Sequence, residues 1–362
     1  MRAFRLIAVF ALTLALPLAL APTSDAGWPN SGRAYGGGGA SVIAASINFP
    51  SGTVGGIACA SLSSCIADTR STSATYITPS GGLSTAAVNT PRVDCSNATC
   101  GLLNEGASTN LALYSNNIGG TGSFVGGAGG YAAPTVTVNN ATAPDGTTTA
   151  SKVAFPSSVG ISNSSEYTVV QAPTASVSAS TNYVFSVFLK GNSGGENYYV
   201  SFNAQSGTYP ILGQTLVTLT TQMARYSAQA SSGTYTTITP TLGVNGSNSG
   251  LVETGQAAST SYAWGAQLES NSFATSFIPT TSSPVTRAAD SMSAAGPLAS
   301  AMSAGQSYVD MIDEATGATS RTLYAAGAFN WPPYKWITQI CAYSPSVGSG
   351  YLTAHSTYGT SC

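Results

Sequence analysis

The stretch Tyr183-Val-Phe-Ser-Val-Phe-Leu-Lys190 decides the fold class of this chain. Every second residue from Tyr183 to Leu189 is apolar, whereas Ser186 and Lys190 belong to the opposite side of an extended backbone. A two-residue period of this kind indicates a β-strand with one buried face. The same alternation recurs in the segments 198–203, 224–229 and 262–269. We therefore expect half-buried antiparallel strands across this central region.

Turn-forming sequences separate these segments, among them Pro144-Asp145-Gly146 and Gly191-Asn-Ser-Gly194. No stretch of comparable length carries the 3.6-residue apolar period of an amphipathic helix. The pattern predicts an all-β fold: a jelly-roll β-sandwich with small β-rich, disulfide-closed segments on its flanks. Trp264 follows the same apolar alternation as Tyr262 and Leu268, so we expect Trp264 between the two sheets.

Composition narrows the functional classes. Only 7% of the 362 residues are charged, and 11 Lys and Arg against 13 Asp and Glu leave no basic surface for a nucleic-acid backbone. The single histidine, His355, rules out a His-rich metal site and makes any His-dependent triad depend on one residue. Hydroxyl and amide side chains in place of charges suit an extracellular β-protein.

Residues 1–26 have the pattern of a secretory signal peptide. Two arginines precede an apolar run over 6–21, and small residues at Ser24 and Ala26 fit cleavage after Ala26. The alternative is a retained membrane anchor, but Pro17 interrupts the run, which is short for the ~20 residues that span a bilayer. We expect a secreted protein with no membrane segment once the leader is removed.

Six cysteines suit an oxidising compartment and fall into three local pairs. Other connectivities are open to six cysteines, but we predict local disulfide bonds. The rival interpretation is a zinc site, which lacks the CxxC spacing and histidine partners that such sites use. The predicted pairs are Cys59 with Cys65, Cys95 with Cys100, and Cys341 with Cys362.

The sequence carries little that points to an enzyme. It contains no P-loop or HExxH motif, and His355 stands among small polar residues that favour a surface loop. Asp310, Asp313 and Glu314 form the one tight acidic group. Paired carboxylates serve glycoside hydrolysis, but these three are expected to be solvated charges at strand ends and turns. We therefore expect no catalytic residues.

No cofactor or metal ion is expected either. A structural calcium ion, which is common in jelly-roll modules, would need clustered oxygen ligands. Glu269 and Asp145 are the candidates, and no ligand-spaced motif supports them.

Motifs between 69 and 290 resemble segments that recur in tail-fibre and other virion proteins of bacteriophages and prophages. They follow one another in an ordered run that covers more than half of the chain. In chain order the motifs are Thr69-Arg-Ser-Thr-Ser-Ala-Thr-Tyr76, Thr85-Ala-Ala-Val-Asn-Thr-Pro-Arg92, Gly101-Leu-Leu-Asn-Glu105, Thr109-Asn-Leu111, Ala143-Pro-Asp-Gly-Thr147, the stretch 183–190, Trp264-Gly-Ala-Gln-Leu-Glu269, Phe273-Ala-Thr-Ser-Phe-Ile-Pro-Thr280 and Val285-Thr-Arg-Ala-Ala-Asp290.

The resemblance implies a carbohydrate-binding-module-like jelly roll over 108–289, after an N-terminal β-rich segment over 57–107 that is typical of phage tail proteins. In that family a concanavalin-like domain often follows, so the β-rich C-terminal module over 290–362 is expected to be a truncated version. The Gly-rich residues 27–56 are expected to be a flexible linker. The leader and the six cysteines depart from the family pattern and indicate a domain recruited into a secreted bacterial protein.

A glycan-binding surface needs aromatic rings that stack on sugar C–H faces, with amide or guanidinium groups that bond to hydroxyls. The polar faces of the expected strands offer such groups, although each of them could equally be an ordinary solvent-facing strand residue. The candidate ligand-binding residues are Tyr199, Asn203, Arg225, Gln229 and Gln267.

The expected function is that of a secreted, non-enzymatic protein that binds a polysaccharide or a cell-surface glycan. Two alternatives stay open: a structural virion or surface-assembly protein without sugar affinity, and, less in keeping with the sequence, a polysaccharide-degrading enzyme. The expected location is extracellular, or the virion if the resemblance to phage tails is literal. A homo-oligomer is compatible with each of these functions.

Overall fold

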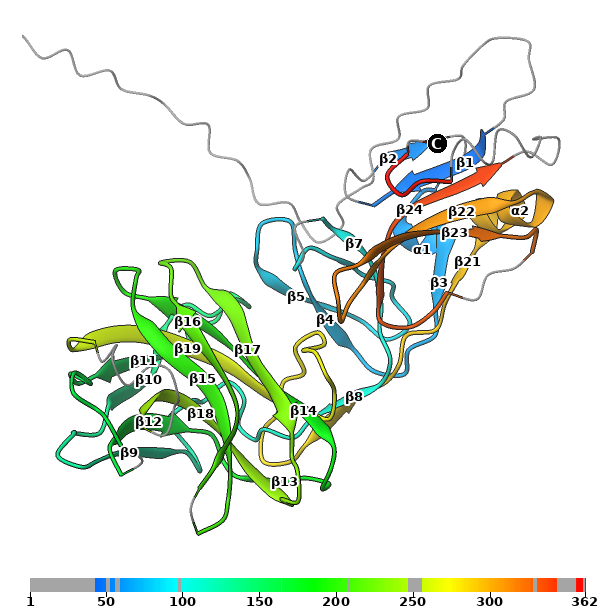
Figure 1. Cartoon of the computed structure of the whole chain (residues 1–362). Helices are drawn as coiled ribbons and strands as arrows, with labels where there is room; N and C mark the ends of the chain where they lie inside the picture. The colour runs from blue at the N-terminus through cyan, green and yellow to red at the C-terminus, as the bar shows by residue number, and fades with distance from the viewer. Residues whose placement is uncertain are drawn as a thin grey trace, which may run out of the picture.

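The computed structural model describes residues 43–49, 53–55, 59–96, 99–163, 165–207, 209–246, 256–327, 331–343, 356–360 and 362. The expected signal peptide, residues 27–42 of the expected linker and His355 lie outside these described residues. Within them the chain forms two β-rich units, a sandwich (mostly green in Figure 1) and a second unit that combines blue and orange segments. No helix in the described part of the chain is long and apolar enough to cross a membrane.

The first unit is a β-sandwich of two antiparallel sheets, as the alternation predicts. The five-stranded sheet has the order β10 (Thr135–Ala141), β11 (Ala150–Phe155), β19 (Ser259–Glu269), β14 (Asn182–Gly191) and β17 (Ala224–Ser231). The six-stranded sheet has the order β16 (Ile211–Thr218), β15 (Asn197–Ala204), β18 (Thr237–Asn245), β12 (Tyr167–Gln171) and β9 (Phe124–Ala128), and β13 (Ala175–Ser176) pairs with β18. The all-β fold class is thereby confirmed.

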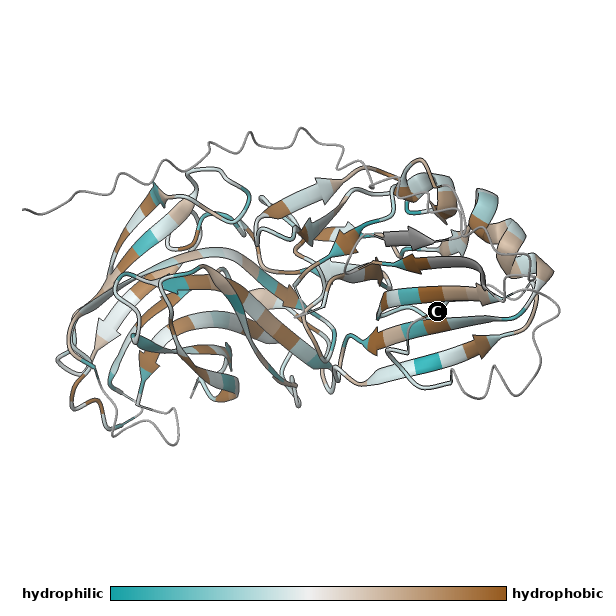
Figure 2. Ribbon diagram, turned by 90° about the horizontal axis from the view of Figure 1, so that it is seen from above, coloured by the Kyte–Doolittle hydropathy of each residue, from teal (hydrophilic) through white to brown (hydrophobic). Residues whose placement is uncertain are grey.

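One apolar core fills the space between the two sheets. Phe185 and Leu189 of β14 belong to it together with Val200 and Phe202 of β15. These are the positions that the two-residue period assigns to a common face, and Figure 2 shows the resulting alternation of hydropathy along the strands. The period therefore predicts the buried face of β14 and of β15 correctly.

The alternation breaks in β19, where Gly265 forms a bulge. Ser186 of β14 pairs with Gln267, but Phe188 pairs with Trp264, so β19 carries one extra residue in this interval. Gly265 has a φ of 70°, and a Cβ there would lie 2.9 Å from the ring of Phe188. Glycine is therefore required at this position.

The bulge moves Trp264 to the outer face of the five-stranded sheet, while Leu268 stays in the core between the sheets. Trp264 is 1% exposed, but it packs against Phe188 and Phe277, at ring-centroid distances of 5.7 and 4.7 Å. Its indole N–H donates to Thr149 Oγ1 at 2.9 Å. The expectation that Trp264 lies between the sheets is wrong, because a bulge reverses which face the following residues occupy.

A small hairpin covers this outer cluster. The hairpin consists of β4 (Ala74–Ile77) and β5 (Leu83–Ala86), and Ile77 and Leu83 pack against the cluster around Trp264. A two-stranded ribbon of β8 (Ser108–Asn110) and β20 (Val285–Arg287) runs between the sandwich and the second unit (Figure 1).

The second unit combines strands from both ends of the described chain. Its seven-stranded sheet has the order β2-β1-β24-β22-β23, and β7 pairs with β24 and with β6. These strands are β1 (Ile43–Asn48), β2 (Thr53–Gly55), β6 (Val93–Asp94), β7 (Gly101–Asn104), β22 (Ser307–Asp313), β23 (Thr319–Tyr324) and β24 (Lys335–Tyr343). The unit also contains the helices α1 (Leu62–Cys65) and α2 (Gly296–Ala304) and a ribbon of β3 (Ile66–Asp68) and β21 (Met292–Ala294).

This sheet changes the expected division of the chain. The segments 57–107 and 290–362 were expected to be separate modules, yet both contribute strands to it. Strands β1 and β2 also fall within 27–56, so the linker interpretation is wrong for these strands. The physical reason is that β1 pairs with β24 and buries Ile47 in the core of the unit, a pairing that local composition does not reveal.

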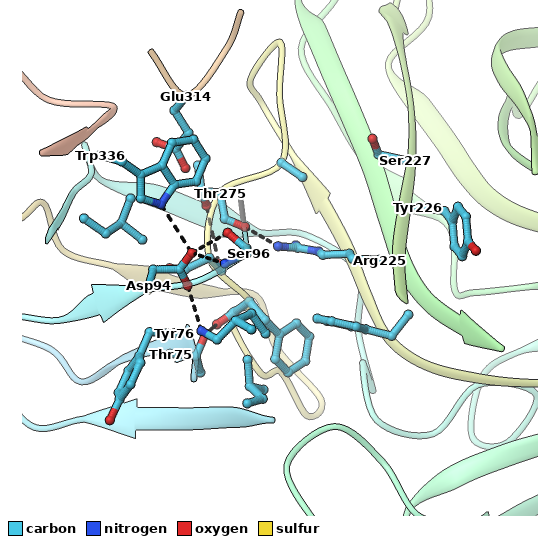
Figure 3. A pocket seen from close by; sticks show the side chains of 17 residues that line it. Thr75, Tyr76, Asp94, Ser96, Arg225, Tyr226, Ser227, Thr275, Glu314 and Trp336 are labelled. Atoms are coloured by element: carbon cyan, nitrogen blue, oxygen red, sulfur yellow. Dashed lines mark hydrogen bonds between the residues drawn. The ribbon is translucent and has the colours of Figure 1, made fainter. Parts of the chain in front are cut away.

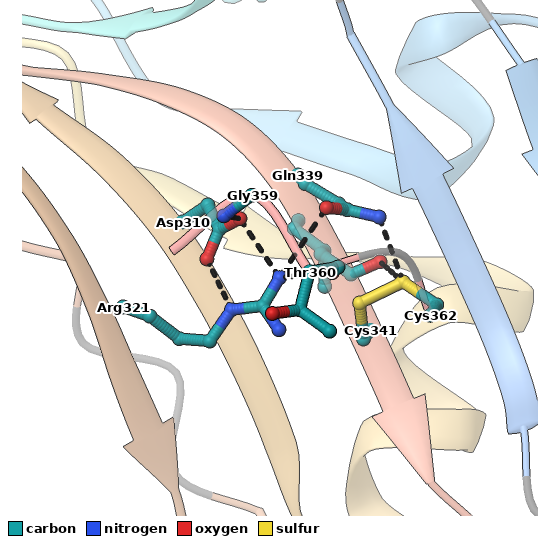
Figure 4. Close-up of a disulfide and its surroundings, with 8 residues drawn as sticks. Asp310, Arg321, Gln339, Cys341, Gly359, Thr360 and Cys362 are labelled. Atoms are coloured by element: carbon teal, nitrogen blue, oxygen red, sulfur yellow. Dashed lines mark hydrogen bonds and ion pairs between the residues drawn. A yellow bond between two sulfur atoms is a disulfide. The ribbon is translucent and has the colours of Figure 1, made fainter. Parts of the chain in front are cut away.

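All three expected disulfide bonds are present: Cys59–Cys65, Cys95–Cys100 and Cys341–Cys362. The last joins β24 to the final residue of the chain (Figure 4). Arg321 holds the same tail through a 2.6 Å hydrogen bond to the carbonyl of Thr360.

Two of the three acidic residues on β22 and the turn after it are not solvated as expected. Asp310 is 1% exposed and binds Arg321, with 2.8 Å between Oδ2 and Nη2. Asp313 pairs with Lys335, and Glu314 is buried at the boundary between the two units. Asp310 is removed from water by Arg321 on the neighbouring strand and by the Gly359 backbone. Glu314 is covered where the two units meet, whereas the side chain of Asp313 stays 26% exposed in its turn.

Candidate functional site

The outer face of the six-stranded sheet carries two parallel rows of side chains that the strand register places side by side. The first row crosses five strands and is apolar apart from one hydroxyl. It runs through Leu216 on β16, Tyr199 on β15, Gly243 on β18, Val169 on β12 and Gly126 on β9. We call this set the apolar row.

Phe124 pairs with Gln171 of β12 in the strand register, and its ring extends over the β9 end of the apolar row. A Cβ on Gly126 would lie 2.3 Å from the Phe124 ring, so the aromatic ring lies directly over this glycine. Phe124 and Leu216, at the two ends of the row, are 49% and 43% exposed. Solvent therefore reaches apolar surface at both edges of this sheet face.

The second row lies next to the first and is made of amides and hydroxyls. It runs through Gln214 on β16, Ser201 on β15, Thr241 on β18 and Gln171 on β12, and we call it the polar row. The Gln171 amide donates to Thr241 Oγ1 at 3.1 Å. This bond fixes the orientation of the Gln171 amide, and the amide oxygen stays on the outer face of the six-stranded sheet.

Beyond the polar row, Asn203 and Thr239 form a further pair on the same face. Gln205 donates to Thr239 Oγ1 at 2.7 Å, and Asn203 donates to the carbonyl of Tyr209 at 3.3 Å. No side chain of these rows is charged, so the face offers hydrogen bonds and apolar contact without a net field.

Two buried polar atoms on this face have no hydrogen-bond partner among the described residues: Tyr199 Oη and Asn203 Oδ1. Burial raises the pKa of Tyr199 to about 12, so its phenol stays protonated and can donate a hydrogen bond at any ordinary pH. Buried polar groups are normally paired, and an unpaired one is expected to find a partner in a ligand or in water.

The five candidate ligand-binding residues divide between the two sheets. Tyr199 and Asn203 lie on the face with the two rows, but each is only 3% exposed, so the expectation of solvent-facing side chains is wrong for both. Neighbouring side chains on a crowded sheet face cover them. Arg225, Gln229 and Gln267 lie instead on the outer face of the five-stranded sheet.

Gln267 is structural rather than free for a ligand. It is 0% exposed, and its amide oxygen accepts a hydrogen bond from the Ile278 backbone at 2.6 Å. Gln229 is exposed, and Arg225 lines a cavity that is described below. The sequence missed Phe124, Gln171, Gln214 and Leu216, because only the pairing register brings them beside Tyr199.

Five charged residues of the phage-like motifs meet in one buried cluster between the two units. Arg92 Nη2 lies 2.6 Å from Glu105 Oε2 and 2.7 Å from Asp290 Oδ2. Arg70 Nη1 lies 2.6 Å from Asp290 Oδ1, and Arg287 Nη2 lies 3.4 Å from Glu105 Oε2. These motif positions are thus explained by pairing of buried charges and not by ligand binding.

Asp68 and Glu314 complete this set of seven residues, which we call the ion cluster. Asp68 Oδ2 lies 2.7 Å from Arg70 Nη1. Glu314 hydrogen-bonds to Glu105, and burial, followed by the charge of Glu105, raises the pKa of Glu314 far above its ordinary value. With Glu314 protonated, the three guanidinium groups face three carboxylates, and the cluster is neutral.

The two calcium candidates have other partners. Glu269 accepts hydrogen bonds from Ser108 Oγ and from the Thr275 backbone, and Asp145 accepts one from Thr147 within a turn. Within the residues that the structure describes, no group of three potential metal ligands occurs.

No protein-family model matches the chain, and no curated protein matches its sequence. A solved structure described as "CBM4 structure and function" is 12% identical, with a TM-score of 0.32 over 45% of this chain and 99% of that chain. The N-terminal cellulose-binding domain of Cellulomonas fimi β-1,4-glucanase C is 16% identical, with a TM-score of 0.28 over 43% of this chain and 93% of that one. The enzymatically active domain of tailspike protein 4 of bacteriophage CBA120 is 9% identical, with a TM-score of 0.30 over 44% of this chain and 21% of that one. At these values the likenesses carry no argument about function.

Proposed function

We propose that this protein is a secreted, non-enzymatic glycan-binding protein that holds a polysaccharide on the outer face of its six-stranded sheet. The observation that carries the proposal is the apolar row beside the polar row. Four strand spacings of about 4.8 Å make the apolar row roughly 19 Å long, enough for several sugar units in a line. A short, isolated sugar would leave most of this row uncovered.

The chemistry of the two rows matches the two sides of a sugar ring. The C–H face of a pyranose packs on the exposed side chains of Leu216 and Phe124, at the two ends of the apolar row, which removes apolar surface from water. The ring hydroxyls, which both donate and accept hydrogen bonds, meet the amides and hydroxyls of the polar row. Tyr199 Oη and Asn203 Oδ1 lack hydrogen-bond partners among the described residues, and they gain them once the ligand displaces the side chains that cover them.

The absence of charge on this face, among its described residues, favours a neutral polysaccharide over an acidic one. A uronic-acid chain would lose hydration of its carboxylates without gaining a counter-charge from the rows. An extracellular site of action is supported by the three disulfide bonds, which persist in oxidising compartments.

The test is affinity electrophoresis and calorimetry of the full chain against neutral oligosaccharides (cellohexaose, xylohexaose and laminarihexaose), with oligogalacturonate as the acidic comparison. Leu216→Ala is the informative variant, because it shortens the apolar row at an exposed position. Leu323→Ala is its matched control, since both leucines are 43% exposed and Leu323 lies on β23 in the second unit.

We expect binding of at least one neutral oligosaccharide, weakened by Leu216→Ala and unchanged by Leu323→Ala. If both variants weakened oligosaccharide binding equally, the outer face of the six-stranded sheet would not be the binding site. No binding to any member of the panel would favour the alternative of a structural virion or surface protein without sugar affinity.

A further inference from the structure

A second site candidate is a cavity at the boundary between the sandwich and the second unit, far from the two rows. Its volume is about 160 Å³. Phe188 and Phe277 of the sandwich and Trp336 of β24 form apolar walls, and the exposed residues Ser96 and Ser227 stand on its lining (Figure 3). A cavity of about 150 Å³ is known to hold benzene, so this one has room for the ring of a single sugar, whose outer hydroxyl groups extend toward the exposed residues Ser96 and Ser227.

Arg225 enters the cavity from the sandwich and has no ion-pair partner within the described residues. Its Nη2 donates to Ser186 Oγ at 2.8 Å, and its Nη1 donates to the carbonyl of Thr275. Its charged carbon lies 5.5 Å from the centre of the Phe188 ring. A guanidinium that is bonded only to neutral acceptors retains hydrogen-bonding strength for a ligand.

Asp94 enters the cavity from the opposite side, and Figure 3 shows it pointing toward the Arg225 side chain across Ser96. Its Oδ1 accepts hydrogen bonds from the Ser96 backbone at 2.9 Å, from the Ser96 hydroxyl and from the Trp336 indole at 3.3 Å. Its Oδ2 accepts one bond, from the Ile77 backbone at 2.7 Å, and keeps a lone pair for a ligand. No cation pairs with it in the described part of the chain. Glu314 also lines the cavity and, being protonated, adds no charge. The cavity thus holds one negative and one positive charge that do not form an ion pair.

These opposed charges determine which ligand the cavity favours. An anion would be attracted by Arg225 but repelled by Asp94. A cation would be attracted by Asp94 but repelled by Arg225. A neutral polyol suits both, since its hydroxyls accept from the guanidinium and donate to the carboxylate. The apolar walls suit the C–H faces of a sugar.

We propose that this cavity binds a single neutral sugar ring, at a site separate from the two rows and independent of the function proposed for them. Arg225 and Asp94 hold hydroxyl groups of the ring, and Trp336 forms the wall on which it packs. Of the five residues that the sequence singled out, Arg225 alone belongs to this second site.

The indole N–H of Trp336 provides a direct readout, because it lies in the cavity wall. Its NMR signal in the full chain is assigned by comparison with Trp336→Phe. The sugars tested are glucose, galactose, mannose, rhamnose and N-acetylglucosamine, at millimolar concentration. Glucosamine and galacturonate serve as positively and negatively charged analogues of glucose and galactose.

We expect at least one neutral sugar to shift the Trp336 signal in a saturable manner and its charged analogue to bind more weakly. Arg225→Gln should weaken this binding about tenfold, as loss of one charged hydrogen bond does, while Lys152→Gln on β11 should leave it unchanged. Ser227→Tyr changes an exposed residue at the cavity and should abolish the shift without disturbing the fold.

No shift with any sugar, or tighter binding of a charged analogue, would overturn this proposal. Leu216→Ala separates the two sites, because it should leave the Trp336 shift intact. If Leu216→Ala loses oligosaccharide binding but keeps the Trp336 shift, the result bears only on the site at the two rows. If no sugar shifts the Trp336 signal while oligosaccharides still bind, the result bears only on the cavity.

Discussion

Glu314→Gln tests the protonation of the ion cluster. In the native protein Glu314 is held protonated by burial and by the neighbouring charge of Glu105. In the unfolded chain its pKa returns to the ordinary value of 4.5, so between about pH 5 and the raised native pKa the native state binds one more proton than the unfolded state. The free energy of unfolding must then fall as the pH rises through this window.

The size of the effect follows from one proton. It amounts to about 1.4 kcal/mol per pH unit, or about 3 kcal/mol between pH 6 and pH 8, as an upper value for a single group. The glutamine amide keeps the shape and can donate to Glu105 without needing a proton from solvent. We therefore expect the variant to lose this part of the pH dependence.

The ionisation of Glu105 does not contribute to the pH dependence of the unfolding free energy between pH 6 and pH 8. Its native pKa is lowered below 4.5 by the guanidinium groups of Arg287 and Arg92, which outweigh its burial, so its contribution is fully present above that pH and is lost only as the pH falls further. Asp68, whose pKa burial raises, is common to both proteins and cancels in their difference.

The assay is urea denaturation of the wild type and Glu314→Gln at pH 6, 7 and 8. The control is Asp313→Asn, because the bond to Lys335 lowers the pKa of Asp313 to about 2, well outside this range. The difference in unfolding free energy between Glu314→Gln and wild type should grow with pH, and that for Asp313→Asn should stay constant. If the unfolding free energies of Glu314→Gln and wild type changed with pH in parallel, Glu314 would not be protonated in the native protein.

Three further predictions concern stability and the roles of single groups. Trp264→Ala should lower the unfolding free energy by roughly 3–5 kcal/mol in thermal melts, because it leaves a cavity where the indole packs against Phe188 and Phe277. A melt like that of the parent would contradict this packing. Tyr199→Phe should leave stability nearly unchanged, because the hydroxyl has no hydrogen-bond partner among the residues that the structure describes, but should weaken oligosaccharide binding in calorimetry; unaltered binding would exclude this hydroxyl from the site. Reduction of the disulfides should remove about 2–3 kcal/mol per short loop from the second unit and leave amide exchange in β14 and β19 unchanged; faster exchange in those strands would contradict the independence of the sandwich.

The sequence predicts what depends on local alternation. Phe185 and Val200 lie in the core where the two-residue period places them, and the local cysteine spacing predicts all three disulfide bonds. A period cannot reveal an inserted residue, so the bulge at Gly265 reverses the face of Trp264. Likewise, the pairing of β1 with β24 joins segments from opposite ends of the described chain, and no local pattern indicates it.

The candidate site was predictable only in part for the same reason. Tyr199 and Asn203 were found because aromatic and amide side chains stand out on the polar side of one strand. Phe124, Gln171 and Leu216 each belong to a different strand, and only the register aligns them into rows. The arginines and carboxylates of the phage-like motifs were visible, but their pairing in the ion cluster depends on how the two units meet.

The central claim is that the two rows form the glycan-binding surface, and the side-chain amide signals of glutamine test it most directly. Gln171 and Gln214 stand in the polar row, whereas Gln229 is exposed on the outer face of the other sheet. The measurement is an NMR titration of the full chain with cellohexaose, xylohexaose and laminarihexaose, in which the three amide signals are followed. We expect a binding oligosaccharide to shift the signals of Gln171 and Gln214 and to leave that of Gln229 in place. A shift of Gln229 alone, or no shift with any of the three, would contradict it.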